Sequence, residues 1–515
     1  MFRKKLVLYT GLAGTAALAA YGQNEIHDSL VGAIRFGRAA VTVSQIAFDY
    51  NRTLYTSKLN PESTAYENER SKVHLRSAEK LLELCRANGG AFIKVGQHLG
   101  ALDYLLPPEY VRTMRVLHSQ APSSPFSDVL SVIREDLQKE PTEVFTSIDP
   151  VPLGTASLAQ VHKATLMDGN TVAVKVQHPL VKTYSNVDMK CMEILARAVA
   201  WFFPDFKLMW LVEETKRNLP CELDFTMEGK NAEQAAKLLQ HLDWLHVPKV
   251  HWDLTTSRVL TMEFCDGLEV GSLAQTTDPV LASKKTEVAK RITQLFAEMI
   301  FENGYVHCDP HPGNVKVQLD ERGSLVLHLL DHGLYTKLST EFRETYAKLW
   351  MSIIRSNVDD IQHYAGKLGV GELFGLFACM LTARSWNAIL SGIDKNQISA
   401  NEEQEIKNDA SKYLIEITEV LHRVPREMLL IFKTNDLLRG LDYMLGVKSS
   451  ASTFVTMSRS CAKATLHRQL EQCSSNWCRI RAKFSYYISQ LRITAYQIYL
   501  WWTTVSHHSR TITAS

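Results

Sequence analysis

The sequence of 515 residues predicts an α+β fold, because two β-hairpins lie among long stretches with helical periodicity. One hairpin is indicated by two apolar runs, Val315–Leu319 and Leu325–Leu330, which flank a polar turn with the sequence Asp-Glu-Arg-Gly-Ser. The other is indicated by Gln160–Leu166 and Thr171–Val176, which enclose an Asp-Gly-Asn turn. In the second strand of that pair, a period of two places Lys175 on the face opposite the valines.

The first helical stretch runs from Ser71 to Leu137. Leu81, Leu84 and Cys85 share one face of a helix that is expected to end at Gly89-Gly90. This block comes before the predicted strands, so it is expected to form a helical extension in front of them.

A second helical stripe leads to the centre of the chain and is expected to be core. It ends at Gly304 and consists of Val288, Ile292, Leu295, Phe296, Met299 and Ile300. Beyond Gly333 the pattern is helical to about Ser458. The strands are therefore surrounded by enough helix for an α+β domain.

Composition excludes several classes of protein. An apolar content of 45% is typical of a globular chain, and a net charge of +2 gives no sign of a nucleic-acid partner. The nine cysteines are scattered and lack Cys-x-x-Cys spacing, so neither a zinc site nor a disulfide framework is predicted. We expect reduced thiols.

The segment Met1–Gly22 has a basic start and then an Ala/Gly/Leu-rich run, with no acidic residue before Glu25. A mitochondrial targeting segment, a membrane anchor and a secretory signal ending near Ala17–Ala19 all fit this pattern. The run is marginal in length for a membrane span. Asn51–Thr53 is a formal glycosylation sequon, but the unpaired cysteines argue against secretion.

The chemistry is concentrated between His307 and Gly333. His307–Asn314 reads His-Cys-Asp-Pro-His-Pro-Gly-Asn, and Asp331 opens an Asp-His-Gly sequence. An Asp followed by four residues and then an Asn has the spacing of the protein-kinase catalytic loop. Asp309 is then the base, while Asn314 and Asp331 hold Mg²⁺ through hard oxygen ligands. The hairpin between them would bring these two ligands side by side.

Each of these patterns also occurs in ordinary turns, which favour Asp, Asn, Pro and Gly. The segment Val172–Lys175 reads Val-Ala-Val-Lys, as in the third strand of a kinase, and it comes upstream in the right order. Three ordered elements together favour the kinase interpretation.

With Lys94–Gln97, which reads Lys-Val-Gly-Gln, these residues resemble the aarF/UbiB family of atypical kinases, and within it the mitochondrial aarF-domain-containing branch. The resemblance covers about Ser71 to about Ser458. It implies a bilobal protein-kinase-like fold with a helical N-terminal extension, ATP and Mg²⁺ as cofactors, and a mitochondrial location.

The resemblance also implies roles for single residues. Lys175 would bind the α- and β-phosphates, and Glu222, in the family's Glu-x-Asp sequence, would pair with Lys175. Asp224 of the same sequence is a candidate regulatory residue. Lys94 and Gln97 would belong to a segment that folds over the active site and regulates access to it.

The nucleotide loop departs from both protein kinases and the family. It reads Gly-Thr-Ala-Ser, where the family has an alanine-rich loop, so nucleotide preference stays open. Small residues still let backbone N–H groups approach phosphate. A strand over Arg258–Phe264 leads to the expected adenine hinge. The predicted nucleotide-binding residues are Gly154, Thr155, Ala156, Ser157, Lys175, Glu263 and Cys265.

Four regions are expected: a targeting or anchor segment (1–22), a helical extension (23–145), an atypical kinase domain (146–458, with its small lobe to about 265) and a C-terminal tail (459–515). The tail is basic and rich in Tyr and Trp. It could contact a membrane surface or pack on the large lobe, and the sequence favours neither.

The function expected is that of an ATP-dependent phosphotransferase or ATPase acting on a small molecule or lipid in mitochondrial membrane or quinone homeostasis. A serine/threonine protein kinase is one alternative, but the absence of an Ala-Pro-Glu sequence after Gly333 and the presence of Lys94–Gln97 count against it. Because Cys308 replaces the usual Arg, regulation through a phosphorylated activation loop is not expected. A pseudokinase scaffold that organises mitochondrial membrane partners is another, although the metal ligands are all retained.

Overall fold

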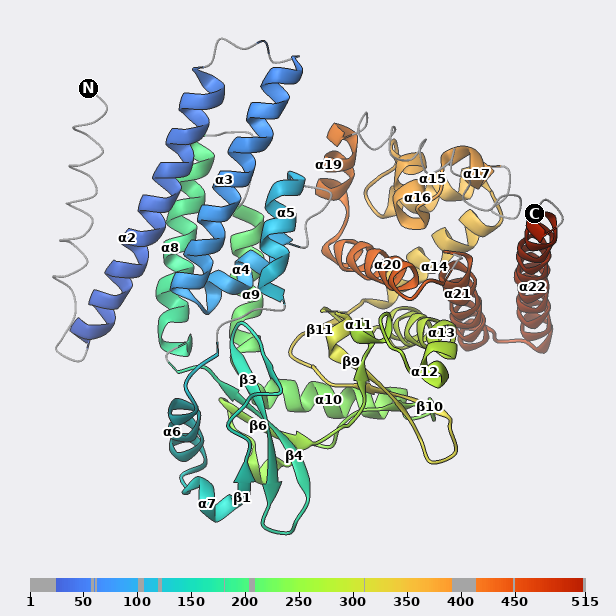
Figure 1. Cartoon of the computed structure of the whole chain (residues 1–515). Helices are drawn as coiled ribbons and strands as arrows, with labels where there is room; N and C mark the ends of the chain where they lie inside the picture. Colours follow the sequence, from blue (N-terminus) through green and yellow to red (C-terminus); the bar gives the residue numbers. More distant parts are fainter. Residues whose placement is uncertain are drawn as a thin grey trace. The chain divides into compact units, whose positions relative to one another are not determined.

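The computed structural model describes residues 25–512, apart from 57–59, 61–62, 101–105, 119–122, 180, 203–208, 310, 391–413 and 448–449. The segment expected to target or anchor the chain, Met1–Gly22, lies outside the described residues. The chain forms two compact units (Figure 1). The first extends to Ala232 and includes Pro248–Phe264, while the second comprises Glu233–Val247 and the chain from Cys265 onward.

The first unit contains an antiparallel sheet of five strands in the order β1-β3-β4-β6, with β2 paired to β3. Its strands are β1 (Phe145–Ile148), β2 (Gly154–Thr155), β3 (Ala159–Leu166), β4 (Thr171–Gln177) and β6 (Val259–Glu263). The predicted β3–β4 hairpin is confirmed, with Thr165 opposite Thr171. Gly169, in its turn, has a φ of +86°, which favours glycine.

One face of this sheet is covered by helix α6 (Phe126–Leu137). Val172, Val174 and Val176 are buried there against Val129 and Ile133 of that helix. The predicted alternation therefore holds, because Lys175 lies between valines that face α6.

The rest of the first unit is helical, and its helices before residue 145 lie in the predicted extension, whereas the later ones lie in the predicted kinase domain. Its helices are α2 (Glu25–Tyr50), α3 (Thr64–Asn88), α4 (Ala91–Gly100), α5 (Pro108–Met114), α7 (Pro141–Val144), α8 (Val181–Phe202), α9 (Met209–Glu222) and the start of α10 (Phe225–Leu239). Leu84 and Cys85 are buried on one face of α3, which ends at Gly89 with a φ of +68°. Figure 1 shows α2, α3 and α8 running beside one another.

The second unit has a sheet in the order β5-β10-β9-β7 and a separate pair, β8 with β11. Its strands are β5 (Leu245–His246), β7 (Leu268–Glu269), β8 (Tyr305–His307), β9 (Val315–Leu319), β10 (Leu325–Leu329) and β11 (Tyr335–Lys337). The predicted hairpin is confirmed as β9–β10, with Leu319 opposite Leu325. The expected α+β class is thus confirmed.

The helices of the second unit supply most of its core. They are α11 (Val270–Leu273), α12 (Pro279–Ser283), α13 (Lys285–Ala297), α14 (Thr340–Ile354), α15 (Val358–Lys367), α16 (Phe374–Thr382), α17 (Trp386–Leu390), α19 (Leu414–Arg423), α20 (Arg426–Met444), α21 (Ser450–Gln472) and α22 (Asn476–Ile512).

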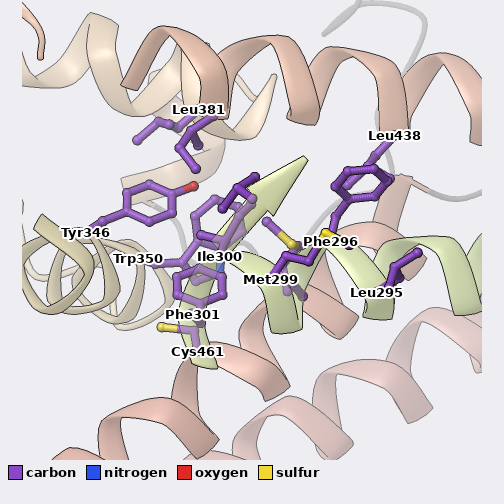
Figure 2. Packing of buried hydrophobic residues seen from close by; sticks show 14 of the residues in the cluster. Leu295, Phe296, Met299, Ile300, Phe301, Tyr346, Trp350, Leu381, Leu438 and Cys461 are labelled. Atoms are coloured by element: carbon purple, nitrogen blue, oxygen red, sulfur yellow. The ribbon is translucent and has the colours of Figure 1, made fainter. Parts of the chain in front are cut away.

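The predicted helical stripe is core. Figure 2 shows Leu295, Phe296, Met299 and Ile300 among buried side chains, which include Trp350 from α14. The helical run then ends at Gly304. Its φ is +64°, a left-handed conformation that favours glycine, and a Cβ there would lie 2.7 Å from Nε of Arg343. Strand β8 follows immediately, and the stripe therefore anchors the segment that leads to Asp309.

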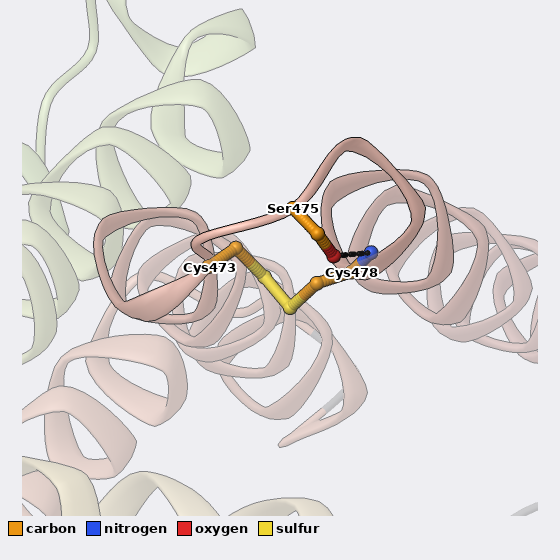
Figure 3. Close-up of a disulfide and its surroundings, with 3 residues drawn as sticks. All are labelled: Cys473, Ser475 and Cys478. Carbon is orange, nitrogen blue, oxygen red and sulfur yellow. Dashed lines mark hydrogen bonds between the residues drawn. A yellow bond between two sulfur atoms is a disulfide. The ribbon is translucent and has the colours of Figure 1, made fainter.

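The expectation that all cysteines are reduced is wrong for one pair. Cys473 and Cys478 form a disulfide across the turn between α21 and α22, with their Cα atoms 5.5 Å apart (Figure 3). In the same turn, the backbone N–H of Cys478 donates to Oγ of Ser475 at 3.2 Å. The other seven cysteines are not part of a disulfide. The turn between the two helices brings Cys473 and Cys478 together, and their spacing in the sequence did not predict the disulfide.

Candidate active site

His307 ties the two predicted metal-binding sequences together. Its ring is buried; Nε2 donates to the backbone oxygen of Asp331 at 2.7 Å, and Nδ1 accepts the N–H of Asp309 at 3.0 Å. Burial lowers the pKa of His307, against the attraction of the nearby Asp331 carboxylate. The ring is therefore neutral, with its proton on Nε2. Through its two hydrogen bonds it fixes the backbone of Asp309 relative to that of Asp331.

Asn314 and Asp331 sit at the two ends of the β9–β10 hairpin. The N–H of Leu330 donates to the backbone oxygen of Asn314 at 2.9 Å. The Asn314 Nδ2 donates to the backbone oxygen of Asp309 at 3.0 Å, which turns the amide oxygen to the other side. One carboxylate oxygen of Asp331 accepts the N–H of Gly333 at 2.9 Å. The hairpin thus places Asn314 and Asp331 on neighbouring segments of backbone. Both side chains carry oxygen atoms, the ligands that Mg²⁺ prefers.

Asp309 lines a small pocket in the second unit. The carboxylate is half exposed, with 48% of its side chain accessible, so a substrate hydroxyl can reach it. Asn314 and His311 lie in the same pocket, and the walls are apolar. Its apolar lining includes Ile292, Phe296, Val315, Leu329, Leu437 and Leu441.

Lys433 is a candidate that the sequence did not reveal. It projects from α20, and its Nζ donates to a carboxylate oxygen of Asp309 at 3.1 Å and to the backbone oxygen of Cys308 at 3.2 Å. No short sequence pattern marks this lysine, because it lies 124 residues beyond Asp309. An ammonium group here can neutralise negative charge developing beside the base.

The predicted partner of Lys175 is wrong. Its Nζ donates to both carboxylate oxygens of Glu228, at 2.7 and 2.8 Å, instead of pairing with Glu222. Both side chains are buried, and the Nζ lies 5.3 Å from the ring centre of Phe225. The physical reason is the helix break: α9 ends at Glu222, and Glu228 lies in the first turn of the next helix, α10.

Glu222 pairs with Lys94 instead. The two charged groups are 2.7 Å apart, and their side chains are only 11% and 16% exposed. Gln97 donates from Nε2 to the backbone oxygen of Leu117 at 3.0 Å. Gly96 permits this close packing, since a Cβ there would lie 2.4 Å from Cδ1 of Leu117. The Lys-Val-Gly-Gln segment is therefore held firmly within the first unit.

Asp224 begins the helix that carries Glu228. Its Oδ1 accepts the N–H of Thr226 at 3.1 Å and the hydroxyl of the same residue at 2.8 Å. Bonds of this kind fix the entry into a helix. Asp224 thus supports α10 and, through it, the position of the glutamate bound to Lys175.

The predicted nucleotide loop connects β2 to β3. Gly154 and Thr155 form β2, and the N–H of Ala156 donates to the backbone oxygen of Ala159 at 2.8 Å. Ser157 is buried. The loop is consequently a short hairpin turn built from small residues.

The predicted hinge lies where the chain leaves the first unit. Glu263 ends β6, and its Oε2 accepts the N–H of Lys249 at 3.2 Å. Cys265 opens the second unit, and its backbone oxygen accepts Nζ of Lys316 at 3.2 Å. The structure therefore divides the predicted site residues: Asp309, Asn314, Asp331 and Cys265 belong to the second unit, and the others to the first.

Comparisons with known proteins support a single family. Residues 116–365 match the ABC1 atypical kinase-like domain, and this range holds every predicted site residue except Lys94 and Gln97. The chain is 48% identical over 506 residues to AarF domain-containing protein kinase 1 of Gallus gallus, covering 97% of this chain and 96% of that protein. Identity is 45% over 507 residues to AarF domain-containing kinase 1 of Drosophila melanogaster, covering 96% of both. It is 34% over 522 residues to the ABC1 family protein MCP2 homolog of Schizosaccharomyces pombe, covering 97% and 93%.

Proposed function

Because the chain belongs to the ABC1 atypical kinase family, whose aarF-domain relatives are named kinases, we propose that it binds ATP with Mg²⁺ and catalyses phosphoryl transfer or ATP hydrolysis. The observation that carries the proposal is the His307 ring, which bonds to both Asp309 and Asp331. A kinase needs its base and its metal ligand held in one fixed arrangement, and this ring supplies that arrangement.

The residues of the second unit suit this chemistry. Asn314 and Asp331 offer an amide and a carboxylate oxygen, which are hard ligands for Mg²⁺; when bound, the ion neutralises phosphate charge. Asp309 accepts the proton of the attacking hydroxyl or water. Lys433, which bonds to Asp309, adds positive charge beside the transferred phosphoryl group.

The first unit supplies the phosphate-binding lysine. Lys175 is oriented by its buried ion pair with Glu228, as the corresponding lysine is in protein kinases. The small side chains of the 154–157 loop let phosphate oxygens come close to its backbone. The substrate that we propose is a small molecule or a lipid, since no Ala-Pro-Glu sequence for peptide docking follows Gly333.

The long helix α22 supports a location at a membrane surface. Trp477, Phe484 and Leu491 recur at intervals of seven on α22 and are 75%, 65% and 71% exposed. Arg479, Arg481, Lys483 and Arg492 give the helix a basic character, which suits anionic lipid. Among the helices described, none is both long and apolar enough to cross a membrane. We propose that the protein acts at a mitochondrial membrane surface, with Met1–Gly22 directing it there.

Two experiments test this location. A chain beginning at Gln23 and tagged at its C-terminus should lose mitochondrial localisation in cells, and N-glycans at Asn51 of the full chain would instead support secretion. Substitution of Trp477, Phe484 and Leu491 by Ser should abolish flotation of the purified protein with anionic vesicles. Undiminished flotation would contradict the role of α22.

The proposed activity is tested through magnesium. Thermal unfolding of the full chain is measured with ATP alone and with ATP and Mg²⁺. Asp331→Asn should keep the fold but lose the Mg²⁺-dependent rise in unfolding temperature. The matched control is Asp359→Asn, an exposed acid in the first turn of α15. An Asp331→Asn variant that responds to Mg-ATP like the wild type would refute the metal assignment.

A further inference from the structure

Three side chains that take no step in the proposed phosphoryl transfer converge in the second unit, although one of them, Cys265, also belongs to the predicted adenine hinge. They are His246 at the end of β5, Cys265 just beyond β6, and His328 in β10. One ligand atom from each lies within 4.8 Å of the other two. The two imidazole rings meet edge to face, with their centroids 5.3 Å apart. Cys265 and His328 are buried, and His246 is partly buried.

The fold fixes all three residues. His246 and His328 are direct partners across the parallel β5–β10 pair, so their side chains leave the sheet on the same face. Cys265 is held by its backbone oxygen, which accepts Nζ of Lys316 at 3.2 Å. Lys316 lies opposite His328 in the β9–β10 pair. The two histidines are therefore built into the sheet, and the backbone of Cys265 is tied to it through Lys316.

The position of the proton on the His328 ring also suits binding of a metal ion. Its Nε2 lies 2.9 Å from Oε1 of Gln318, which can only accept a hydrogen bond. Nε2 therefore carries the proton, and the buried Nδ1 keeps its lone pair. Metal-binding histidines are commonly oriented in this way, by an oxygen acceptor on the other ring nitrogen.

We propose that His246, Cys265 and His328 bind a Zn²⁺ ion. One thiolate and two imidazoles form a ligand set suited to Zn²⁺ and poorly suited to Mg²⁺, which prefers oxygen. Binding forms a bond from sulfur to zinc, and the thiol proton passes to the solvent. The fourth position of the tetrahedron is open to water or another donor. The ion joins β5, β10 and the segment after β6, and so stabilises the second unit.

The direct test uses Co²⁺ as a spectroscopic substitute for Zn²⁺. The full chain is stripped with a chelator, dialysed and titrated with Co²⁺ without nucleotide. A thiolate ligand gives a near-ultraviolet charge-transfer band, and added Zn²⁺ should remove this band by displacing the Co²⁺. Zn²⁺ should also raise the unfolding temperature of the stripped protein. A wild-type protein that shows neither the band nor the stabilisation refutes the site.

Variants identify the ligands. Cys265→Ser should eliminate the band, and His328→Gln should weaken Zn²⁺ binding strongly. Gln318→Leu, which keeps all three ligands, should weaken it by about 10- to 100-fold. The matched controls are Cys379→Ser in α16 and His363→Gln in α15 of the same unit, and both should bind Zn²⁺ as the wild type does.

The variants are compared only when their metal-free unfolding curves match the wild type, and Gln318→Leu remains informative if Cys265→Ser does not fold. An unchanged band in Cys265→Ser would assign the thiolate elsewhere and overturn the proposal. Asp331→Asn should retain Zn²⁺ binding, so failure of the kinase proposal and failure of the zinc proposal are distinguishable.

Discussion

Lys175 and Glu228 form a buried, two-pronged ion pair, in which the ammonium group lies 2.7 and 2.8 Å from the two carboxylate oxygens. Burial excludes the water that would otherwise screen the pair, so its geometry is held tightly. Removing one partner from a buried pair strands a charge and costs about 3–5 kcal/mol. The pair thus contributes to the stability of the first unit, and it fixes the direction in which Lys175 points.

Glu228→Gln should therefore destabilise the protein by about 3 kcal/mol and weaken ATP binding. Glu222→Gln is the matched comparison and should leave the affinity for ATP closer to the wild-type value, because its carboxylate pairs with Lys94. Chemical denaturation measures the first effect and nucleotide titration the second. A larger loss of ATP affinity in Glu222→Gln than in Glu228→Gln would show that Glu222, and not Glu228, orients Lys175.

The contrast between Glu222 and Glu228 shows where sequence reasoning succeeds and fails. The two hairpins were predictable because strand alternation and turn residues are local signals. The partner of Lys175 was not, because it depends on where α9 stops and α10 starts.

Contacts between distant segments left no local pattern at all. Lys433 reaches Asp309 from α20, and the His246, Cys265 and His328 cluster forms only when β5 pairs with β10. Metal-ligand spacing is readable in a sequence when the ligands share a short motif. Here the ligands come from three separate segments, so only the folded sheet reveals them.

Lys433→Met should lower the rate of phosphoryl transfer or ATP hydrolysis by about 10²-fold, the usual cost of removing one group that stabilises transition-state charge. The KM for ATP should change little, because Lys433 contacts the base rather than any predicted nucleotide residue. Lys348→Met, at an exposed position of α14, is the control. Equal turnover in the two variants would exclude Lys433 from the chemistry.

The buried ring of His307 predicts a pH dependence of stability. Burial lowers its pKa, so between that value and the unfolded value near 6.5 the unfolded chain binds more protons than the folded one. Stability from this group is therefore complete above about pH 6.5 and is lost as the pH falls below it.

His307→Gln should be less stable than the wild type at about pH 7.5, and the difference should shrink at about pH 5.5. Free energies of unfolding from urea denaturation at both pH values check this, because all other titrating groups are common to both proteins. His363→Gln, on the surface of α15, is the control. A constant difference would show that the ring does not resist protonation.

The ion pair between Lys94 and Glu222 leads to the last prediction, that the Lys-Val-Gly-Gln segment suppresses protein phosphorylation. The two charges lie 2.7 Å apart with little exposure, and Gln97 and Gly96 fix the segment against Leu117. If this segment limits access to the active site, loss of the ion pair that holds it should alter catalysis. Lys94→Ala should therefore increase autophosphorylation or change the affinity for ATP markedly, and Glu222→Ala should also increase autophosphorylation.

Three quantities are measured on purified protein: ATP affinity, ATPase rate and autophosphorylation. Lys72→Ala is the matched control, since it removes an exposed ion pair with Glu69 on α3, and such pairs contribute about 0–1 kcal/mol. Unfolding temperatures separate release of the segment from general destabilisation. If Lys94→Ala and Glu222→Ala match Lys72→Ala in all three quantities, the segment is structural and does not regulate access, because removing either half of a regulatory pair must change at least one of them.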